Sequence, residues 1–153
     1  VDQLVITGDF FVQNGVEAEY WVAALHYLRS ATKMFYGGEA ETLGAPPPVV
    51  KLNGYGDFIF NNVPVVVTNF TVDLPQDVDY IATGLGKAMS TEKSVSGAAG
   101  QTIKEKRDSV SWAPTQSLIT VTVQPLYSRR EIEKFSLQNY VNGEYIKNGG
   151  GFI

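Results

Sequence analysis

One stretch of the chain has the hydrophobic spacing of an amphipathic helix. Apolar side chains recur every three or four residues over residues 16–35, and Glu17 and Glu19 suit the positive end of a helix dipole. Gly37 and Gly38 predict the C-terminal end of this helix. Its main apolar line consists of Trp21, Leu25, Leu28, Thr32 and Phe35, with Ala24 and Ala31 beside it.

A second apolar line widens this face of the predicted helix. It consists of Tyr20, Tyr27 and Met34. A helix that covers one sheet needs an apolar stripe of only ~100°. Because the sector here is wider, we expect the helix to pack on its own sheet with one side and to contact a neighbour with the other.

The rest of the pattern alternates with the period of two that is typical of strands. We expect a strand at 4–12, a short one at 49–52, two strands around Asn61-Asn62, and a long one through 118–123 that ends or bends at Pro125. In the second strand of the middle pair, the predicted core face is Val66, Thr68, Phe70, Val72 and Leu74. The run of valines specifies that register only weakly.

Two segments lack a useful hydrophobic period. Residues 83–108 are rich in Gly, Ser, Ala and charge, and we expect a long mobile loop that a partner orders. Residues 141–153 form a C-terminal tail with aromatic side chains among turn signals, and we expect this tail to dock on a surface. Since the chain begins within a strand pattern at Val1, we interpret it as one domain of a longer polypeptide.

Composition narrows the possible functions. A chain of 153 residues corresponds to a single domain, and its net charge of −4 argues against nonspecific binding to DNA phosphates. The absence of cysteine excludes disulfides, thiolate zinc sites and cysteine nucleophiles. No apolar run approaches the ~20 residues that a membrane-spanning helix needs.

The sequence gives no positive support for catalysis. His26 is the single histidine, so we interpret it as a surface or partly buried helix residue, with neither a catalytic nor a metal-binding role. The stretch GLGKAMS fails as a phosphate loop because Ile81 stands where the first glycine is required and Ala88 follows the lysine. No cofactor or metal is expected.

Carboxylates are the remaining candidates for chemistry. Asp73, Asp77 and Asp79 form the densest acidic group, which we interpret as turn chemistry around Pro75. As a calcium loop the group would need an oxygen ligand in place of Ile81. A hydrolase would have Asp79 and Glu92 as its candidate carboxylates, without supporting spacing.

Longer segments of the chain carry a family resemblance. PPPVVKLNGYGDFIFNNVPVVVTNFTVDLPQDVDYI (46–81), SWAPTQSLITVTVQPLYSRREIEKFSL (111–137) and the helix before them resemble tail-tube and baseplate hub proteins of tailed bacteriophages, including the tube initiators of contractile tails. The pattern is a helix ending in Phe-Tyr-Gly, a proline-led strand with a glycine-rich turn, and two long strands before the tail. The resemblance covers residues 10–135, and the segment 83–108 fits it least.

The resemblance implies a tail-tube fold, with two antiparallel sheets packed as a sandwich or barrel and one flanking helix. Its members form rings, often hexamers, around a channel through which DNA passes without specific binding. It therefore implies a structural virion protein of the phage tail, assembled in the host cytoplasm, with adjacent tube, baseplate or sheath proteins as partners and no membrane. A wall that repels phosphate suits a DNA conduit, and the negative charge agrees with that.

We expect the oligomer interface to use aromatic and long apolar residues of the helix and the tail. These are Trp21, Tyr27, Met34, Phe35, Tyr140 and Tyr145, and we expect plain core packing for at least Trp21. We expect strand edges to contribute, and the segment 83–108 to reach a neighbouring subunit. The alternative is a ligand- or carbohydrate-binding β-sandwich module of a tail or receptor-binding apparatus, which would use the aspartate group and exposed tyrosines.

Overall fold

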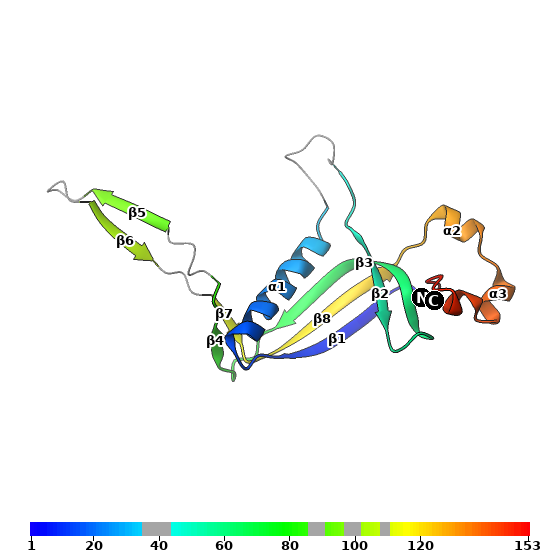
Figure 1. Ribbon diagram of the computed structural model, residues 1–153, viewed down its shortest axis with the longest axis horizontal. Helices are drawn as coiled ribbons and strands as arrows, with labels where there is room; N and C mark the ends of the chain where they lie inside the picture. Colours follow the sequence, from blue (N-terminus) through cyan, green and yellow to red (C-terminus); the bar gives the residue numbers. More distant parts are fainter. Residues whose placement is uncertain (35–43, 86–90, 97–101, 108–110) are drawn as a thin grey trace. The chain divides into compact units, whose positions relative to one another are not determined.

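The computed structural model describes residues 1–34, 44–85, 91–96, 102–107 and 111–153, with the backbone alone described at 91–96 and 102–107. The strands and helices follow one another along the chain as Figure 1 shows. The strands are β1 (Leu4–Phe11), β2 (Val49–Gly54), β3 (Phe60–Asp73), β4 (Tyr80–Ala82), β5 (Thr91–Ser96), β6 (Thr102–Arg107), β7 (Trp112–Pro114) and β8 (Gln116–Pro125). The helices are α1 (Gly15–Ala31), α2 (Arg129–Glu133), α3 (Leu137–Val141) and α4 (Glu144–Lys147).

The chain forms two compact units, each built from segments that are far apart in sequence. The first contains Val1–Gly8, Tyr27–Thr71 and Ile119–Ile153, and the second contains Asp9–His26 and Val72–Leu118. The first unit holds most of the main sheet and all three short helices. The second holds the first part of α1 and the four strands β4, β5, β6 and β7.

The main sheet has four strands in the order β1-β8-β3-β2, so β1 and β2 are its edge strands (Figure 1). In the first unit these strands form an antiparallel half-barrel. Strand β4 pairs with β7 and strand β5 with β6, both antiparallel. The predicted fold class, a mainly β α+β protein with antiparallel sheets and one long helix, is confirmed.

A hairpin connects β2 and β3, and its turn lies just after Asn53-Gly54, where the sequence predicts the turn that ends the first strand. Tyr55 and Gly56 have φ angles of 58° and 85°, and this left-handed pair reverses the chain. Asn61-Asn62, expected between two strands, lies inside the single strand β3. Asn62 has a φ of 55° and donates its backbone N–H to Asn53 Oδ1 at 2.8 Å, so the predicted turn is instead a local irregularity of one strand.

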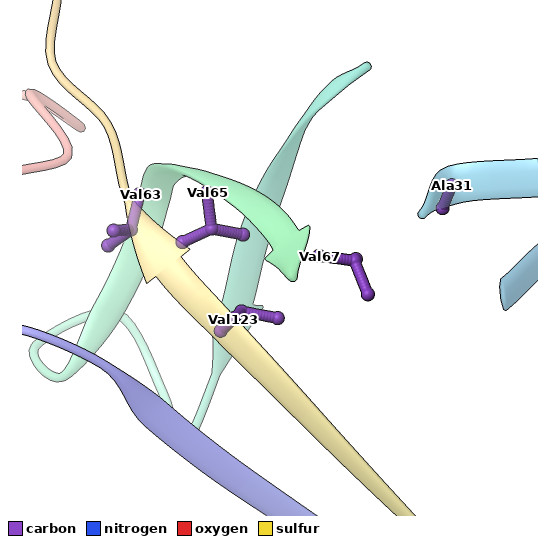
Figure 2. Close-up of a cluster of buried hydrophobic side chains, with 5 residues drawn as sticks. All are labelled: Ala31, Val63, Val65, Val67 and Val123. Carbon is purple, nitrogen blue, oxygen red and sulfur yellow. The ribbon is translucent and has the colours of Figure 1, made fainter. Parts of the chain in front are cut away.

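The core of the first unit consists mainly of valines. Figure 2 shows Val63, Val65 and Val67 following one another along β3, with Val123 on β8 and Ala31 at the end of α1. In the β2–β3 register Val50 lies opposite Val65 and Leu52 opposite Val63. Residues directly opposite each other share a face, so Val50 and Leu52 extend the same apolar layer.

The predicted core face of β3 was wrong for the first half of the strand. Val65 and Val67 are buried, whereas Val66 is half-buried and Thr68 is exposed. Further along, Phe70 and Val72 of the predicted face are half-buried and Asn69 is exposed. The more buried side therefore changes along this 14-residue strand. Strands are right-handedly twisted, so one alternation pattern does not hold one face inward over such a length.

Two further predictions differ from the structure. Helix α1 ends at Ala31, short of the expected residue 35, because the N–H of Lys33 closes a tight turn on the carbonyl of Ser30 at 3.1 Å. The expected end at Gly37-Gly38 lies outside the described residues.

The segment 83–108, predicted to lack regular structure, contains β5 and β6, in which Thr91 pairs with Arg107 and Ser96 with Thr102. Its mobility stays a prediction.

Candidate functional site

The first turn of α1 is fixed by side-chain capping. Asn14 Oδ1 accepts the backbone N–H of Glu17 at 2.9 Å, and the Glu17 carboxylate accepts the N–H of Gln13 at 2.7 Å. This pair of bonds is a variant of the capping box, in which the Glu17 carboxylate bonds to the N–H of Gln13 and not to that of the N-cap residue Asn14. The helix therefore begins at Gly15 and carries the two predicted apolar lines as far as Ala31.

The main apolar line of α1, which we call the inner line, is buried within the second unit as far as Leu25. Ala18, Trp21 and Leu25 have little exposed surface, and Trp21 is 7% exposed. The indole Nε1–H of Trp21 donates to Ser117 Oγ at 2.8 Å. Trp21 therefore contributes to the interior of the second unit. Its predicted interface role is not supported by an exposed surface.

The second apolar line of α1, which we call the outer line, is exposed. Tyr20 is 69% exposed and Tyr27 is 58% exposed, and Val16 and Ala23 share their exposure. Residues 16, 20, 23 and 27 follow one another at intervals of four, three and four, which places them along one side of a helix. Met34, beyond the end of α1, is also exposed. Phe35, the remaining predicted helix residue, lies outside the described residues.

The C-terminal tail docks on its own unit. The ring of Phe152 stacks on Tyr127 with centroids 4.7 Å apart, and the backbone N–H of Ile153 donates to the Tyr127 hydroxyl at 3.2 Å. Ile153 packs against the valine core. The expectation of a docking tail is thus met within one chain, and contact of the tail with a neighbouring subunit stays a prediction.

Tyr145 and Tyr140 belong to an aromatic cluster beside this tail. The Tyr145 ring stacks on Phe135 at 5.7 Å, and its hydroxyl accepts the N–H of Ser136 and donates to the carbonyl of Lys134. The Tyr140 ring lies 5.8 Å from Phe135 and is more exposed. Tyr145 is therefore engaged in holding its own segment, whereas Tyr140 still presents surface for a partner.

At the start of α2, hydrogen bonds between Ser128 and Glu131 shift the pKa of the glutamate. Ser128 Oγ accepts the N–H of Glu131 at 3.3 Å, and the Glu131 carboxylate accepts the N–H of Ser128 at 2.8 Å. The backbone bond from Ser128, followed by the bond with its side chain, lowers the pKa of Glu131 below its ordinary value. Lys51 adds a smaller lowering effect through its charge. This site is a structural cap.

The candidates for catalysis lie on different elements of the chain. His26 is exposed on α1, and Asp79 immediately precedes β4. The side chain of Glu92 lies outside the described part of the chain. Within the described residues, Asp73, Asp77 and Asp79 do not group into a set of three metal-ligating side chains, and no other His or carboxylate trio does.

The structure reveals one surface feature that sequence reasoning missed. A groove of about 310 Å³ lies along residues 4–7 of β1, residues 52–54 of β2 and Tyr55 of the following turn, with Phe60 of β3 at its wall. The alternation predicted both strands, but it contains no signal for which strands become the edges of a sheet. Strand order depends on long-range pairing, which the local pattern does not encode.

No described helix is long and apolar enough to cross a membrane. Comparison with protein-family models, with curated proteins and with solved structures finds no match to this chain. What the protein does is therefore inferred from its own residues and surfaces.

Proposed function

We propose that this protein is a structural subunit of a tailed-phage tail, a component of the tail tube or baseplate hub that forms a ring around the DNA channel and performs no catalysis. The observation that carries the proposal is the exposed outer line of α1, which has Tyr20 and Tyr27 at its centre. Exposed apolar side chains that gather along one element mark protein–protein contact surfaces. The sequence resemblance supplies the identity of the assembly.

Other features support the same proposal. Both edges of the main sheet lack a partner strand among the described residues, which leaves them open to pairing with another chain. A subunit that offers different surfaces on its two sides forms heterologous contacts, and such contacts close into rings. A hexamer is the expected ring. The net charge of −4 suits a channel wall that DNA passes without binding.

The test measures assembly. Sedimentation velocity of the full chain over rising concentration, with electron micrographs of the assembled tail, is expected to show a ring that contains this subunit. Tyr27→Ser is expected to weaken association by at least about tenfold, because it removes an aromatic anchor from the contact. His26→Ser, one position along the same helix, is the matched control and is expected to leave association unchanged. Persistent monomers together with tails that lack such a ring would overturn the proposal.

A second candidate function is recognition of a carbohydrate. In the β4–β7 register Tyr80 lies opposite Pro114 and Ala82 opposite Trp112, so Tyr80 and Trp112 are diagonal neighbours on one face. Both rings are about half exposed. Exposed aromatic faces suit stacking on sugar rings. A glycan-array signal that is lost in Trp112→Ala and retained in Tyr27→Ser would favour this function over the structural one.

A further inference from the structure

Asparagine followed by glycine occurs four times in this chain, at Asn14, Asn53, Asn142 and Asn148. In such a pair the backbone nitrogen of the glycine can attack the side-chain amide carbon of the asparagine and close a five-membered ring. Glycine favours this step because it has no Cβ to hinder the approach and because its backbone rotates freely. Each pair is a candidate for spontaneous loss of the amide group, and the fold makes the four pairs unequal.

Two of these asparagines have side chains that are held by hydrogen bonds. Asn14 Oδ1 accepts the backbone N–H of Glu17 at 2.9 Å, and Asn14 Nδ2 donates to Glu17 Oε1 at 3.1 Å. Asn53 Oδ1 accepts the backbone N–H of Asn62 at 2.8 Å. Ring closure requires the side chain to turn toward the nitrogen of the next residue, so it would break these bonds. The fold therefore protects Asn14 and Asn53.

The other two asparagines are exposed, and their side chains form no hydrogen bond with the described residues. Asn142 is the C-cap of α3, and Asn148 is the C-cap of α4. In both pairs the N–H of the following glycine donates to a carbonyl of the preceding helix, at 3.0 Å for Gly143 and at 3.3 Å for Gly149. The longer bond is the weaker one, so the nitrogen of Gly149 is more easily freed.

The residues that follow also separate these two pairs. Residues 149–151 are three successive glycines, whereas Gly143 is followed directly by Glu144 at the start of α4. Rotation of the backbone brings the glycine nitrogen to the amide carbon, and glycines absorb such a rotation with the least steric cost. Asn148 therefore combines a free side chain, a weakly held nitrogen and a backbone that rotates easily.

We propose that Asn148 is a site of self-modification, at which the side-chain amide is lost through a cyclic imide formed with Gly149. The Gly149 nitrogen bonds to Cγ of Asn148, the Cγ–Nδ2 bond breaks, and ammonia leaves with the hydrogen of the Gly149 N–H. One water molecule then opens the ring at either of its carbonyl carbons. Opening at one carbon leaves aspartate, and opening at the other leaves isoaspartate, whose backbone is longer by one methylene.

The isoaspartate product does not fit the docked tail. The glycines that follow lie close to Asn62, since a Cβ added at Gly149 would lie 3.1 Å from Asn62 Nδ2 and one added at Gly151 would lie 2.5 Å from the carbonyl oxygen of Asn62. A backbone longer by one methylene moves these glycines relative to Asn62 and leaves them no space. The modification therefore displaces Phe152 from its stacking contact with Tyr127 and releases the tail.

The experiment incubates the full chain in mildly alkaline buffer and follows each pair by peptide mapping with mass spectrometry. Loss of the amide at Asn148 is expected to be at least about tenfold faster than at Asn14 and Asn53, where hydrogen bonds of the side chain must break first. It is also expected to be faster than at Asn142. In urea the four pairs are expected to react at similar rates, because the fold no longer distinguishes them.

A ranking in the folded chain that does not place Asn148 first would overturn the proposal. The same ranking in urea as in buffer would also overturn it, because the neighbouring sequence and not the fold would then set the rates.

Two variants test the release of the tail. Asn148→Gln keeps an exposed amide on a longer side chain that does not readily close the ring, and it is expected to keep the tail docked after the same incubation. Asn142→Gln is the matched control and is expected to leave the modification of Asn148 unchanged. Nuclear Overhauser effects between Phe152 and Tyr127 should disappear in the isoaspartate fraction of the parent chain. Their persistence in that fraction would overturn the proposed release.

Discussion

The indole nitrogen of Trp21 donates its hydrogen to the hydroxyl of Ser117 across 2.8 Å, and both side chains are buried. The bond joins α1 to β8 over 96 residues of sequence. It also removes Trp21 from the surface, so the side of α1 that remains for a partner is the outer line around Tyr20 and Tyr27. The inner anchor holds the helix to its own unit, and the outer line is the surface that we propose contacts a neighbour.

Replacing Ser117 by alanine tests this anchor. The change leaves the volume of the core nearly intact but leaves the Trp21 N–H without its acceptor, so the free energy of unfolding should fall by about 1–3 kcal/mol. Urea denaturation followed by circular dichroism measures it. Ser111→Ala, at an exposed position, should change stability by less than about 0.5 kcal/mol. Equal effects of the two variants would contradict the structural role of the bond.

A pair of neighbouring valines tests which face of β3 is buried. Val65→Ala removes two methyl groups from the core and should lower the free energy of unfolding by about 2 kcal/mol. Val66→Ala makes the same chemical change at a half-buried position, and should cost less than about 1 kcal/mol. The same denaturation experiment measures both, and a reversed order would restore the face predicted from the sequence.

These valines illustrate what a local pattern can predict. Alternation identified β1, β2 and β8 because apolar and polar residues differ clearly there. The unbroken run of valines in β3 has no such contrast, so its inward face depends on packing with Val50 and Leu52, which no local pattern contains. The strands β5 and β6 were missed for a related reason. Their segment has no hydrophobic period, and the two strands pair with each other.

The candidate site, too, was predictable from the sequence only in part. Helical spacing predicted a second apolar line through Tyr20, Tyr27 and Met34. Tyr20 and Tyr27 are exposed on α1, and Met34 is exposed beyond its end. Their role in an interface stays a prediction. The same spacing placed Trp21 on the main apolar line, but it could not identify the buried acceptor Ser117, which is distant in sequence. The groove along β1 and β2 was out of reach, since a strand becomes an edge only through the order of the whole sheet.

The cap of α2 predicts a measurable pH dependence. Hydrogen bonds from Ser128 lower the pKa of Glu131 in the folded chain, so Glu131 stabilises the fold in its ionised form. The contribution should be fully present above the ordinary pKa of a glutamate, and should be lost as the pH falls through the lowered pKa. A carboxyl NMR titration measures this pKa. Ser128→Ala removes the hydroxyl but keeps the backbone N–H, so the pKa should return only part of the way toward the ordinary value, and an unchanged pKa there would assign the shift to the backbone bond alone.

The backbone conformation of Gly151 and its lack of a Cβ allow the tail to dock, and its replacement should release the tail. Gly151 is buried with a φ of 70°, and a Cβ added there would lie 2.5 Å from the carbonyl oxygen of Asn62. Gly151→Ala should therefore displace Phe152 from Tyr127 and Ile153 from the core. Loss of ring-to-ring nuclear Overhauser effects between Phe152 and Tyr127 would report this displacement directly.

Gly56 provides the matched control for this variant. It has a similar positive φ of 85°, but an added Cβ would meet nothing within 4 Å. Gly56→Ala should therefore cost only the backbone strain, about 1 kcal/mol, and leave the tail docked. Gly151→Ala adds the clash with Asn62 and the exposure of Ile153, so its cost should exceed that of Gly56→Ala by at least about 1 kcal/mol. Equal costs with an unmoved Phe152 would mean that the tail is held by its aromatic contacts alone.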